Sequence, residues 1–174
     1  ILAAAFDELR EYMQTNLIGA SHVTEEEPLA EFSLPQETVT RLCFFAVPIG
    51  LQSQYRDQVF PLAEHAGLVP VTAADVISPG ENYTAKIDAI MRRSVAAVVD
   101  AATQATMVEL GMLMGMRKPL RTLIVVEKGA AIPSEVADQV VAQRAKGPIA
   151  DQPTLLRAFD EWFRRVAADI QPQL

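Results

Sequence analysis

The chain has 174 residues, half of them apolar, and its formal net charge is -7. This length and apolar content suit one α/β domain with a sizeable core and a short extension. The acidic balance argues against a non-specific nucleic-acid surface, because binding to phosphates is driven by clustered Lys and Arg.

The cysteine count and the hydropathy bear on the cellular compartment. The single Cys43 excludes an intrachain disulfide and a Cys-based metal site, which fits a reducing, cytoplasmic setting. No apolar run reaches the roughly 18 residues that a bilayer span needs, so no membrane partner is expected. The N-terminus lacks a secretory signal pattern. The first residue is Ile1 rather than Met, which suggests that something upstream has been cut away or is not shown; an upstream domain is one possibility.

Residues 1–40 are predicted to form an amphipathic helix followed by an acidic linker. Apolar residues recur at helical spacing, namely Ile1, Leu2, Ala5, Phe6, Leu9, Met13 and Leu17. The segment 19–40 has the composition of a linker. An apolar stripe of this length gains most of its stability by packing. We therefore expect self-association through this helix, through the apolar helix after Glu109, or through both. The alternative is that the stripe folds back onto its own domain.

Residues 41–174 are predicted to form a single α/β domain. Short apolar runs predict strands at Leu42–Val47, Val69–Thr72, Val95–Val99 and Thr122–Val126. Helical patterns separate them at 52–66, 82–93, 106–117 and 133–143, and a last helix follows Pro153. Pro61 lies inside the first of these helices, which must bend or restart there. Strands that alternate with helices indicate a parallel sheet buried on both faces.

Two carboxylates flank the loop after the third predicted strand. Asp100 ends that strand, and Glu109 lies on the first turn of the helix that follows, a helix that is apolar nearly all round and should be buried. Ligands of open α/β sheets bind at this edge. A glutamate held ionised by the helix dipole is a candidate nucleophile, and Asp100 is a candidate to protonate or hold a leaving group. The spacing Thr106-x-x-Glu109 also matches a capping box with Thr106 at the N-cap, so a purely structural role stays open.

The turn after the first strand, Pro48-Ile49-Gly50, can bring backbone amides close to a ligand. Neither a G-x-G-x-x-G nor a P-loop motif occurs, so a nicotinamide dehydrogenase and a P-loop nucleotidase lack support. His22 lies in the acidic linker and His65 lies beside Glu64 on a helix, so both are expected to be surface residues. No histidine pair has metal-ligand spacing. Neither a metal nor a cofactor is expected.

Several motifs together carry a family resemblance. They are Phe44-Phe-Ala-Val-Pro-Ile-Gly50, Tyr55, Ile87-x-x-Ile90, Val98-Val-Asp100, Thr106-x-x-Glu109-Leu-Gly111, Gly115-x-x-Lys118-Pro119 and Leu123-Ile124-Val125. Over about residues 41 to 128 the chain resembles the nucleoside 2-deoxyribosyltransferase-like superfamily, whose relatives include nucleotide N-glycosidases and, more distantly, TIR-type NAD-cleaving domains.

The resemblance implies a flavodoxin-like, doubly wound parallel sheet of four to five strands. It also implies that Glu109 attacks the anomeric carbon of a nucleoside while Asp100 binds the substrate or handles the leaving base. Expected substrate contacts are Pro48, Ile49, Gly50, Tyr55, Asn82 and Thr106. The family usually assembles as dimers or larger oligomers, so a homo-oligomer is expected.

We therefore expect a hydrolase or transferase that acts on the N-glycosidic bond of a nucleoside, nucleotide or dinucleotide. Two alternatives remain open. One is a non-catalytic nucleotide-sensing or interaction module, and the other is a TIR-like NAD hydrolase that acts as an effector.

Overall fold

In the computed structural model, the described residues are 41–75, 83–116, 121–130 and 140–170. All of them belong to one compact unit that comprises residues 34–174. The predicted N-terminal helix and linker, together with His22, Asn82 and Lys118, lie outside the described residues.

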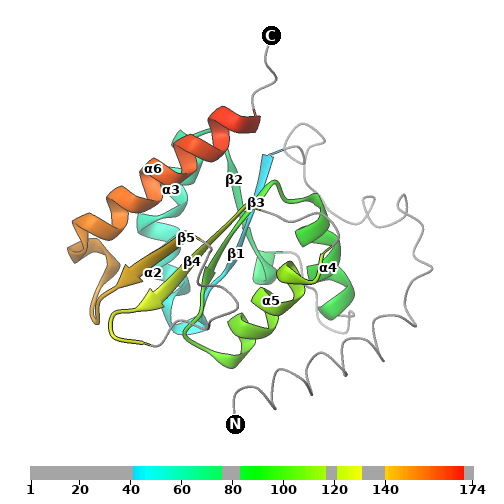
Figure 1. The fold of residues 1–174 in the computed structure, drawn as a ribbon, viewed down its shortest axis with the longest axis horizontal. Coiled ribbons are helices and arrows are strands. Elements are labelled where there is room, and N and C mark those ends of the chain that lie inside the picture. The colour runs from blue at the N-terminus through cyan, green and yellow to red at the C-terminus, as the bar shows by residue number, and fades with distance from the viewer. Residues whose placement is uncertain (1–40, 76–82, 117–120, 131–139, 171–174) are drawn as a thin grey trace. The chain divides into compact units, whose positions relative to one another are not determined.

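Five parallel strands form the sheet, and their order is β2-β1-β3-β4-β5 (Figure 1). The strands are β1 (Leu42–Ala46), β2 (Val69–Thr72), β3 (Ala96–Asp100), β4 (Arg121–Glu127) and β5 (Val140–Arg144). This is the flavodoxin-like topology, so the predicted fold class is confirmed.

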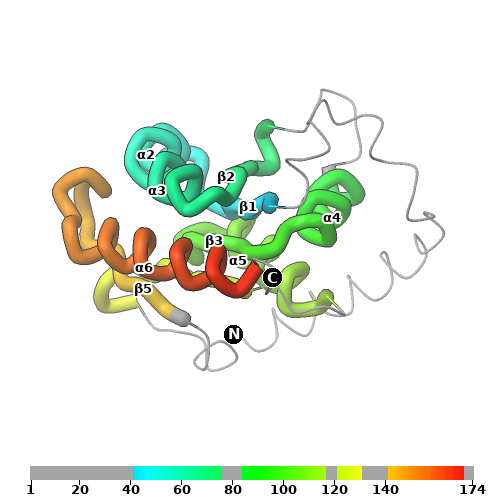
Figure 2. The backbone as a smooth tube through the Cα atoms, turned by 90° about the horizontal axis from the view of Figure 1, so that it is seen from above, coloured from blue at the N-terminus to red at the C-terminus, as the bar shows by residue number. Residues whose placement is uncertain are grey.

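Helices cover both faces of the sheet. On one face lie α2 (Gln52–Gln58), α3 (Phe60–His65) and α6 (Pro153–Ile170), and on the other lie α4 (Tyr83–Arg93) and α5 (Gln104–Met114) (Figures 1 and 2). Every residue of β1 and β3 is buried, which explains why these strands read as continuous apolar runs. The core on the first face is rich in aromatic rings, among them Phe45, Tyr55, Phe159 and Phe163.

The predicted helix over 52–66 is divided at Val59. The first part, α2, ends at Gln58, and the second, α3, begins at Phe60 with Pro61 in its first turn. A proline is tolerated there because the first backbone N–H groups of a helix have no partner within it. The expectation that the helix restarts around Pro61 is confirmed.

The prediction of a helix over 133–143 is wrong for the carboxyl end of that range. Val140–Arg144 forms strand β5, which pairs with β4 in parallel through Val125↔Ala142 and Glu127↔Arg144. Backbone pairing with β4 and burial of Ala142 outweigh the helical preference of this stretch. Residues 131–139 lie outside the described residues.

The sheet has β2 at one edge, where it pairs with β1 in the register Cys43↔Pro70. This strand has four residues, and Pro70 provides no backbone N–H. Proline within a strand is confined to sheet edges and bulges, which agrees with the position of β2.

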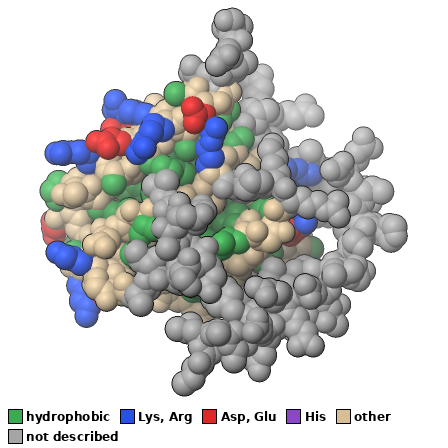
Figure 3. All heavy atoms as spheres, viewed as in Figure 1, with side chains coloured by type: hydrophobic (Ala, Val, Ile, Leu, Met, Phe, Trp, Pro, Cys, Tyr) green, Lys and Arg blue, Asp and Glu red, His purple; other side chains and the backbone are tan. Residues whose placement is uncertain are grey.

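The final helix, α6, buries the predicted apolar face. Leu155, Phe159, Trp162, Phe163 and Val166 are buried, and Leu156 and Ile170 pack against the same core as partly buried residues. Its outward face carries side chains of both charge signs, seen at the upper left of Figure 3, including the pair Arg164–Asp160 at 3.0 Å. No helix in the described part of the chain is long and apolar enough to cross a membrane.

The predicted burial of the helix after Asp100 is only partly correct. Leu110, Met112 and Leu113 of α5 are buried, but the side chains of Val108 and Met114 are 38% and 47% exposed. The helix is apolar on both sides, yet only one side packs against the sheet.

Candidate functional site

The carboxyl edge of the sheet has a topological switch point between β1 and β3. These two strands are neighbours, but the chain leaves β1 towards α2 on one face and leaves β3 towards α5 on the other (Figure 2). The two loops therefore diverge. In open α/β sheets this divergence forms the crevice in which ligands bind.

The loop after β1 contributes an open surface at this edge. Pro48 precedes a short 3-10 helix, η4 (Ile49–Leu51), which is closed by a 2.8 Å bond from Leu51 N–H to the carbonyl of Pro48. The side chain of Ile49 is 88% exposed. A Cβ added to Gly50 would meet no atom within 4 Å, and the φ angle of Gly50 is not positive. Neither packing nor backbone conformation therefore requires glycine at this position.

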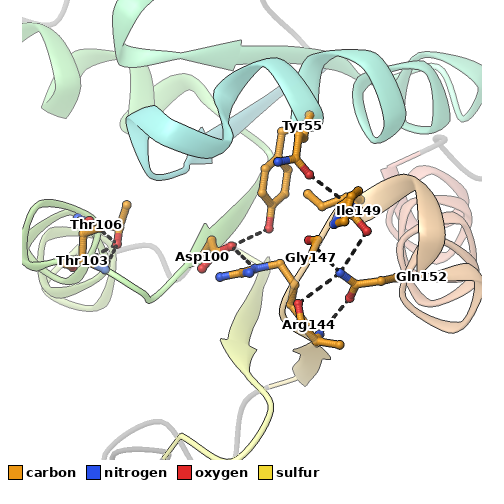
Figure 4. Close-up of polar contacts among 11 residues, drawn as sticks. Tyr55, Asp100, Thr103, Thr106, Arg144, Gly147, Ile149 and Gln152 are labelled. Carbon is orange, nitrogen blue, oxygen red and sulfur yellow. Dashed lines mark hydrogen bonds and ion pairs between the residues drawn. The ribbon is translucent and has the colours of Figure 1, made fainter.

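Asp100, at the carboxyl end of β3, is the centre of a buried polar network (Figure 4). The hydroxyl of Tyr55 donates to Asp100 Oδ2 at 2.9 Å, and Arg144 Nε donates to the same oxygen at 2.9 Å. The side chains of Asp100 and Arg144 are 0% and 7% exposed. Asp100 Oδ1 is also buried and has no hydrogen-bond partner among the described residues. Asp100 therefore acts as an acceptor in an ion pair that is shielded from solvent.

Tyr55 extends from α2 towards Asp100. Its ring packs edge-on against Phe45 and Phe159, with centroid separations of 6.5 and 6.0 Å. Burial and the neighbouring Asp100 carboxylate raise the pKa of Tyr55 well above its usual value. Tyr55 therefore stays protonated, and its hydroxyl donates a hydrogen bond to Asp100 Oδ2. A contact between Tyr55 and a substrate stays a prediction.

Arg144 was not among the residues predicted for the site, because the segment that carries it was expected to be helical. Once Val140–Arg144 is known to be a parallel strand, Arg144 falls at the same sheet edge as Asp100. The signal in the sequence is a charged residue that directly follows the run Val140-Val-Ala-Gln143.

The loop after β5 is held by side-chain amides close to this network (Figure 4). Gln152 Oε1 accepts from the N–H of Ala145 at 2.8 Å, and Gln152 Nε2 donates to the carbonyls of Ala145, Gly147 and Pro148. Gln54 of α2 accepts from the N–H of Ile149 at 2.9 Å. These bonds attach the segment after β5 to α2 and to Gln152, the residue directly before α6, which fixes the backbone that carries Arg144.

The N-terminus of α5 is closed by a capping box formed by Thr103 and Thr106. The N–H of Thr106 donates to Thr103 Oγ1 at 3.3 Å, and the N–H of Thr103 donates to Thr106 Oγ1 at 3.2 Å. The alternative capping box, with Thr106 at the N-cap and Glu109 closing it, is therefore wrong. The helix begins three residues earlier because Thr103 also has a hydroxyl that can cap it.

Glu109 lies on the second turn of α5 rather than on the first, since the helix begins at Gln104. Its side chain is 8% exposed and shares the buried side of α5 with Thr106, Leu110 and Leu113. This side packs against β1 and β3. The helix dipole acts mainly within the first turn, so it contributes less to Glu109 than the sequence led us to expect.

A second polar cluster lies where β2 ends. Asp75 Oδ2 accepts from the N–H and the hydroxyl of Thr72 at 2.7 and 2.8 Å, and Asp75 Oδ1 accepts from Arg56 Nη2 at 2.5 Å. Burial alone would raise the pKa of Asp75, but the bonds from Arg56 and Thr72 outweigh it and lower the pKa. The cluster fixes the turn after β2.

Among the residues that the structure describes, no group of three His, Cys, Asp or Glu side chains is placed to hold a metal ion. His65 is exposed at the end of α3, as expected.

The sequence matches no protein-family model, and it has no significant match among curated proteins. The resemblance to nucleoside 2-deoxyribosyltransferases therefore rests on the motifs alone, and what it implies about activity is a proposal.

Proposed function

We propose that the protein cleaves or transfers the N-glycosidic bond of a nucleoside, nucleotide or dinucleotide. The observation that carries the proposal is the buried carboxylate of Glu109, on the helix that leaves β3 at the switch point of the sheet. A carboxyl group at the carboxyl edge of an open α/β sheet lies where such folds bind their ligands, and a buried ionisable side chain at that edge is a candidate for a chemical role.

The reaction would be a double displacement at the anomeric carbon. The carboxylate of Glu109 attacks C1′ and the base departs, which leaves a glycosyl ester on Glu109. Water or an acceptor base then attacks the same carbon and regenerates the carboxylate. The open surface at Ile49 and Gly50 offers room for the sugar or the base on the opposite side of the switch point.

One observation favours a rival function, a nucleotide-sensing module without catalysis. Asp100, the second carboxylate of the family pattern, has no exposure to solvent, and its Oδ2 is occupied by Tyr55 and Arg144. In a sensor the same switch-point crevice would bind a nucleotide without cleaving it.

The test is base release by Glu109→Gln. The amide keeps the shape of the side chain but is not an anionic nucleophile, so we expect release from nucleosides, nucleotides and NAD to fall by at least about a hundredfold. Chromatography of the released base measures it, with thermal unfolding to show that the fold is kept. Glu64→Gln, at an exposed site on α3, is the matched control and should retain full turnover.

The outcomes separate the two functions. Equal turnover by wild type and Glu109→Gln would remove Glu109 from the mechanism. A wild type that releases no base from the whole panel, but binds a nucleotide tightly in calorimetry, would replace the enzyme with the sensor.

A further inference from the structure

We propose that the site acts on N-glycosides whose base carries a positive charge, such as pyridinium or N7-alkylated purine nucleosides and nucleotides. This inference rests on the proposed function and narrows its substrate class. It follows from the hydrogen bonds and the ion pair that the structure gives Asp100. In the family resemblance, Asp100 is the carboxyl group that would protonate a leaving base.

The charge of the base decides whether an acid is needed. When the C1′–N bond breaks, its electron pair stays on the base nitrogen. A neutral purine or pyrimidine then becomes an anion unless an acid gives it a proton as it leaves. A base with a positive charge becomes neutral and needs no proton.

Asp100 is poorly suited to give such a proton. Its Oδ2 accepts from both Tyr55 and Arg144 Nε, each at 2.9 Å. If Asp100 were protonated, the guanidinium of Arg144, which is 7% exposed, would stay buried without its counter-ion. The ion pair therefore holds Asp100 in the form that has no proton to give.

The need to recover a proton in every catalytic cycle is a second reason why Asp100 is a poor general acid. A general acid must recover its proton from solvent in every cycle, but Asp100 has no solvent exposure. Its Oδ1 is buried and has no hydrogen-bond partner among the described residues through which a proton could arrive. Tyr55 is poorly suited to relay one, because burial and the Asp100 carboxylate raise its pKa, and its hydroxyl proton is already engaged in the hydrogen bond to Asp100 Oδ2.

The balanced reaction needs only water as a second reactant. A carboxylate oxygen of Glu109 forms a bond to C1′ while the C1′–N bond breaks, and the electron pair of that bond neutralises the base. Water then attacks C1′, the ester bond to Glu109 breaks, and one proton passes to solvent. The sum is a cationic N-glycoside and water giving a free sugar, a neutral base and H⁺.

The experiment compares 7-methylguanosine with guanosine, which differ by one methyl group and one positive charge. We expect the wild-type protein to release 7-methylguanine, and also nicotinamide from nicotinamide mononucleotide. A site in which Asp100 gives no proton to the leaving base forgoes a factor of about 10²–10⁴ on guanosine. The rate enhancement over uncatalysed hydrolysis in the same buffer should therefore be smaller for guanosine by about that factor.

A substitution at Asp100 supplies a second readout. We expect Asp100→Asn to change turnover of both substrates by the same factor, because Asp100 protonates neither base. A loss at least a hundredfold greater for guanosine would show that Asp100 is the acid and would overturn the inference. If this variant does not fold, the wild-type comparison decides alone.

The remaining outcomes distinguish failure of the charge requirement from failure of the proposed glycosidase activity. Equal rate enhancements for guanosine and 7-methylguanosine would overturn the charge requirement and leave the proposed glycosidase activity intact. Release of bases only from neutral nucleosides would overturn the inference and leave the glycosidase activity intact. Absence of base release from these three substrates and from the whole panel of nucleosides, nucleotides and NAD would overturn the glycosidase activity itself, and the inference with it.

Discussion

Asp100 receives two hydrogen bonds on one carboxylate oxygen and none from the described residues on the other. Its two donors come from α2 and β5, 45 and 44 residues away in the chain. A buried ion pair of this kind is weak evidence for stability. Removing one partner, however, leaves the other charge buried without a counter-ion and lowers the free energy of unfolding by about 3–5 kcal/mol. At the scale of single residues, the network fixes the ends of two elements to the edge of the sheet.

Tyr55 should make the folding stability depend on pH in alkaline solution. A tyrosine in the unfolded chain loses its proton near pH 10, whereas Tyr55 in the folded protein keeps its proton to higher pH. Its raised pKa therefore contributes stability that is fully present below about pH 10 and is lost as the pH rises further, by about 1.4 kcal/mol per pH unit. Urea unfolding of the wild type between about pH 8 and pH 11 measures the slope.

The control is Tyr55→Phe, which keeps the ring packed against Phe45 and Phe159 but has no proton to lose. This variant should be less stable at every pH, since Asp100 loses a donor, but its stability should fall less steeply above pH 10. Parallel curves for the two proteins would contradict the assignment.

At the scale of elements, the start of α5 depends on two threonines. Thr103 and Thr106 exchange backbone-to-hydroxyl bonds at 3.2 and 3.3 Å, and the loop between β3 and α5 holds only Ala101, Ala102 and Thr103. Because the loop is this short, the cap sets where Glu109 falls on the helix.

We expect Thr103→Ala to lower the free energy of unfolding by about 1 kcal/mol, the usual cost of losing an N-cap oxygen. Thr103→Ser should be nearly neutral, since it keeps the oxygen and removes only a methyl group from an exposed residue. The midpoint and slope of urea unfolding measure both variants. Similar losses of stability in Thr103→Ala and Thr103→Ser would show that the methyl group of Thr103, and not its capping oxygen, stabilises the helix.

The strands of this fold were predictable wherever burial on both faces produced a continuous apolar run. Val69–Thr72 has the predicted bounds, and β1, β3 and β4 differ from their predictions by one or two residues. Strand β5 was missed because its exposed edge position leaves Gln143 in solvent and gives no continuous run. Its structure depends on pairing with β4, which local sequence does not reveal.

The candidate site, like the sheet, was predictable only in part. The motif order placed Asp100 at the end of β3 and Glu109 on the helix that follows it. The partner of Asp100 was not predictable, because Arg144 reaches it only through the β5 pairing. The cap was misplaced by one turn, because Thr106-x-x-Glu109 matches the usual capping-box pattern, whereas the observed box has a threonine, Thr106, in place of the usual Glu or Gln.

At the scale of the whole molecule, we expect self-association in solution through α5, the N-terminal segment or both. The outward side of α5 leaves Val108 and Met114 partly exposed. Val108→Glu combined with Met114→Lys should shift the mass measured by light scattering towards the monomer, because charges on such a surface oppose burial. Gln104→Glu, at an exposed position on the same helix, is the control.

Deletion of residues 1–18 tests the other surface. A dimer that becomes a monomer on deletion would assign assembly to the N-terminal segment. A wild type that is monomeric at all concentrations would contradict both assignments. Loss of base release together with loss of assembly would indicate that the site borrows residues from a neighbouring subunit.

The short edge strand β2 limits how copies of this protein can aggregate. A foreign strand that aligned along β2 would find at most four residues to pair with, and Pro70 among them has no N–H to donate. A continuous backbone ladder from molecule to molecule, the architecture of amyloid fibrils, cannot readily start on this side. In crowded or concentrated solution, contacts made there should remain side-chain contacts that come apart on dilution.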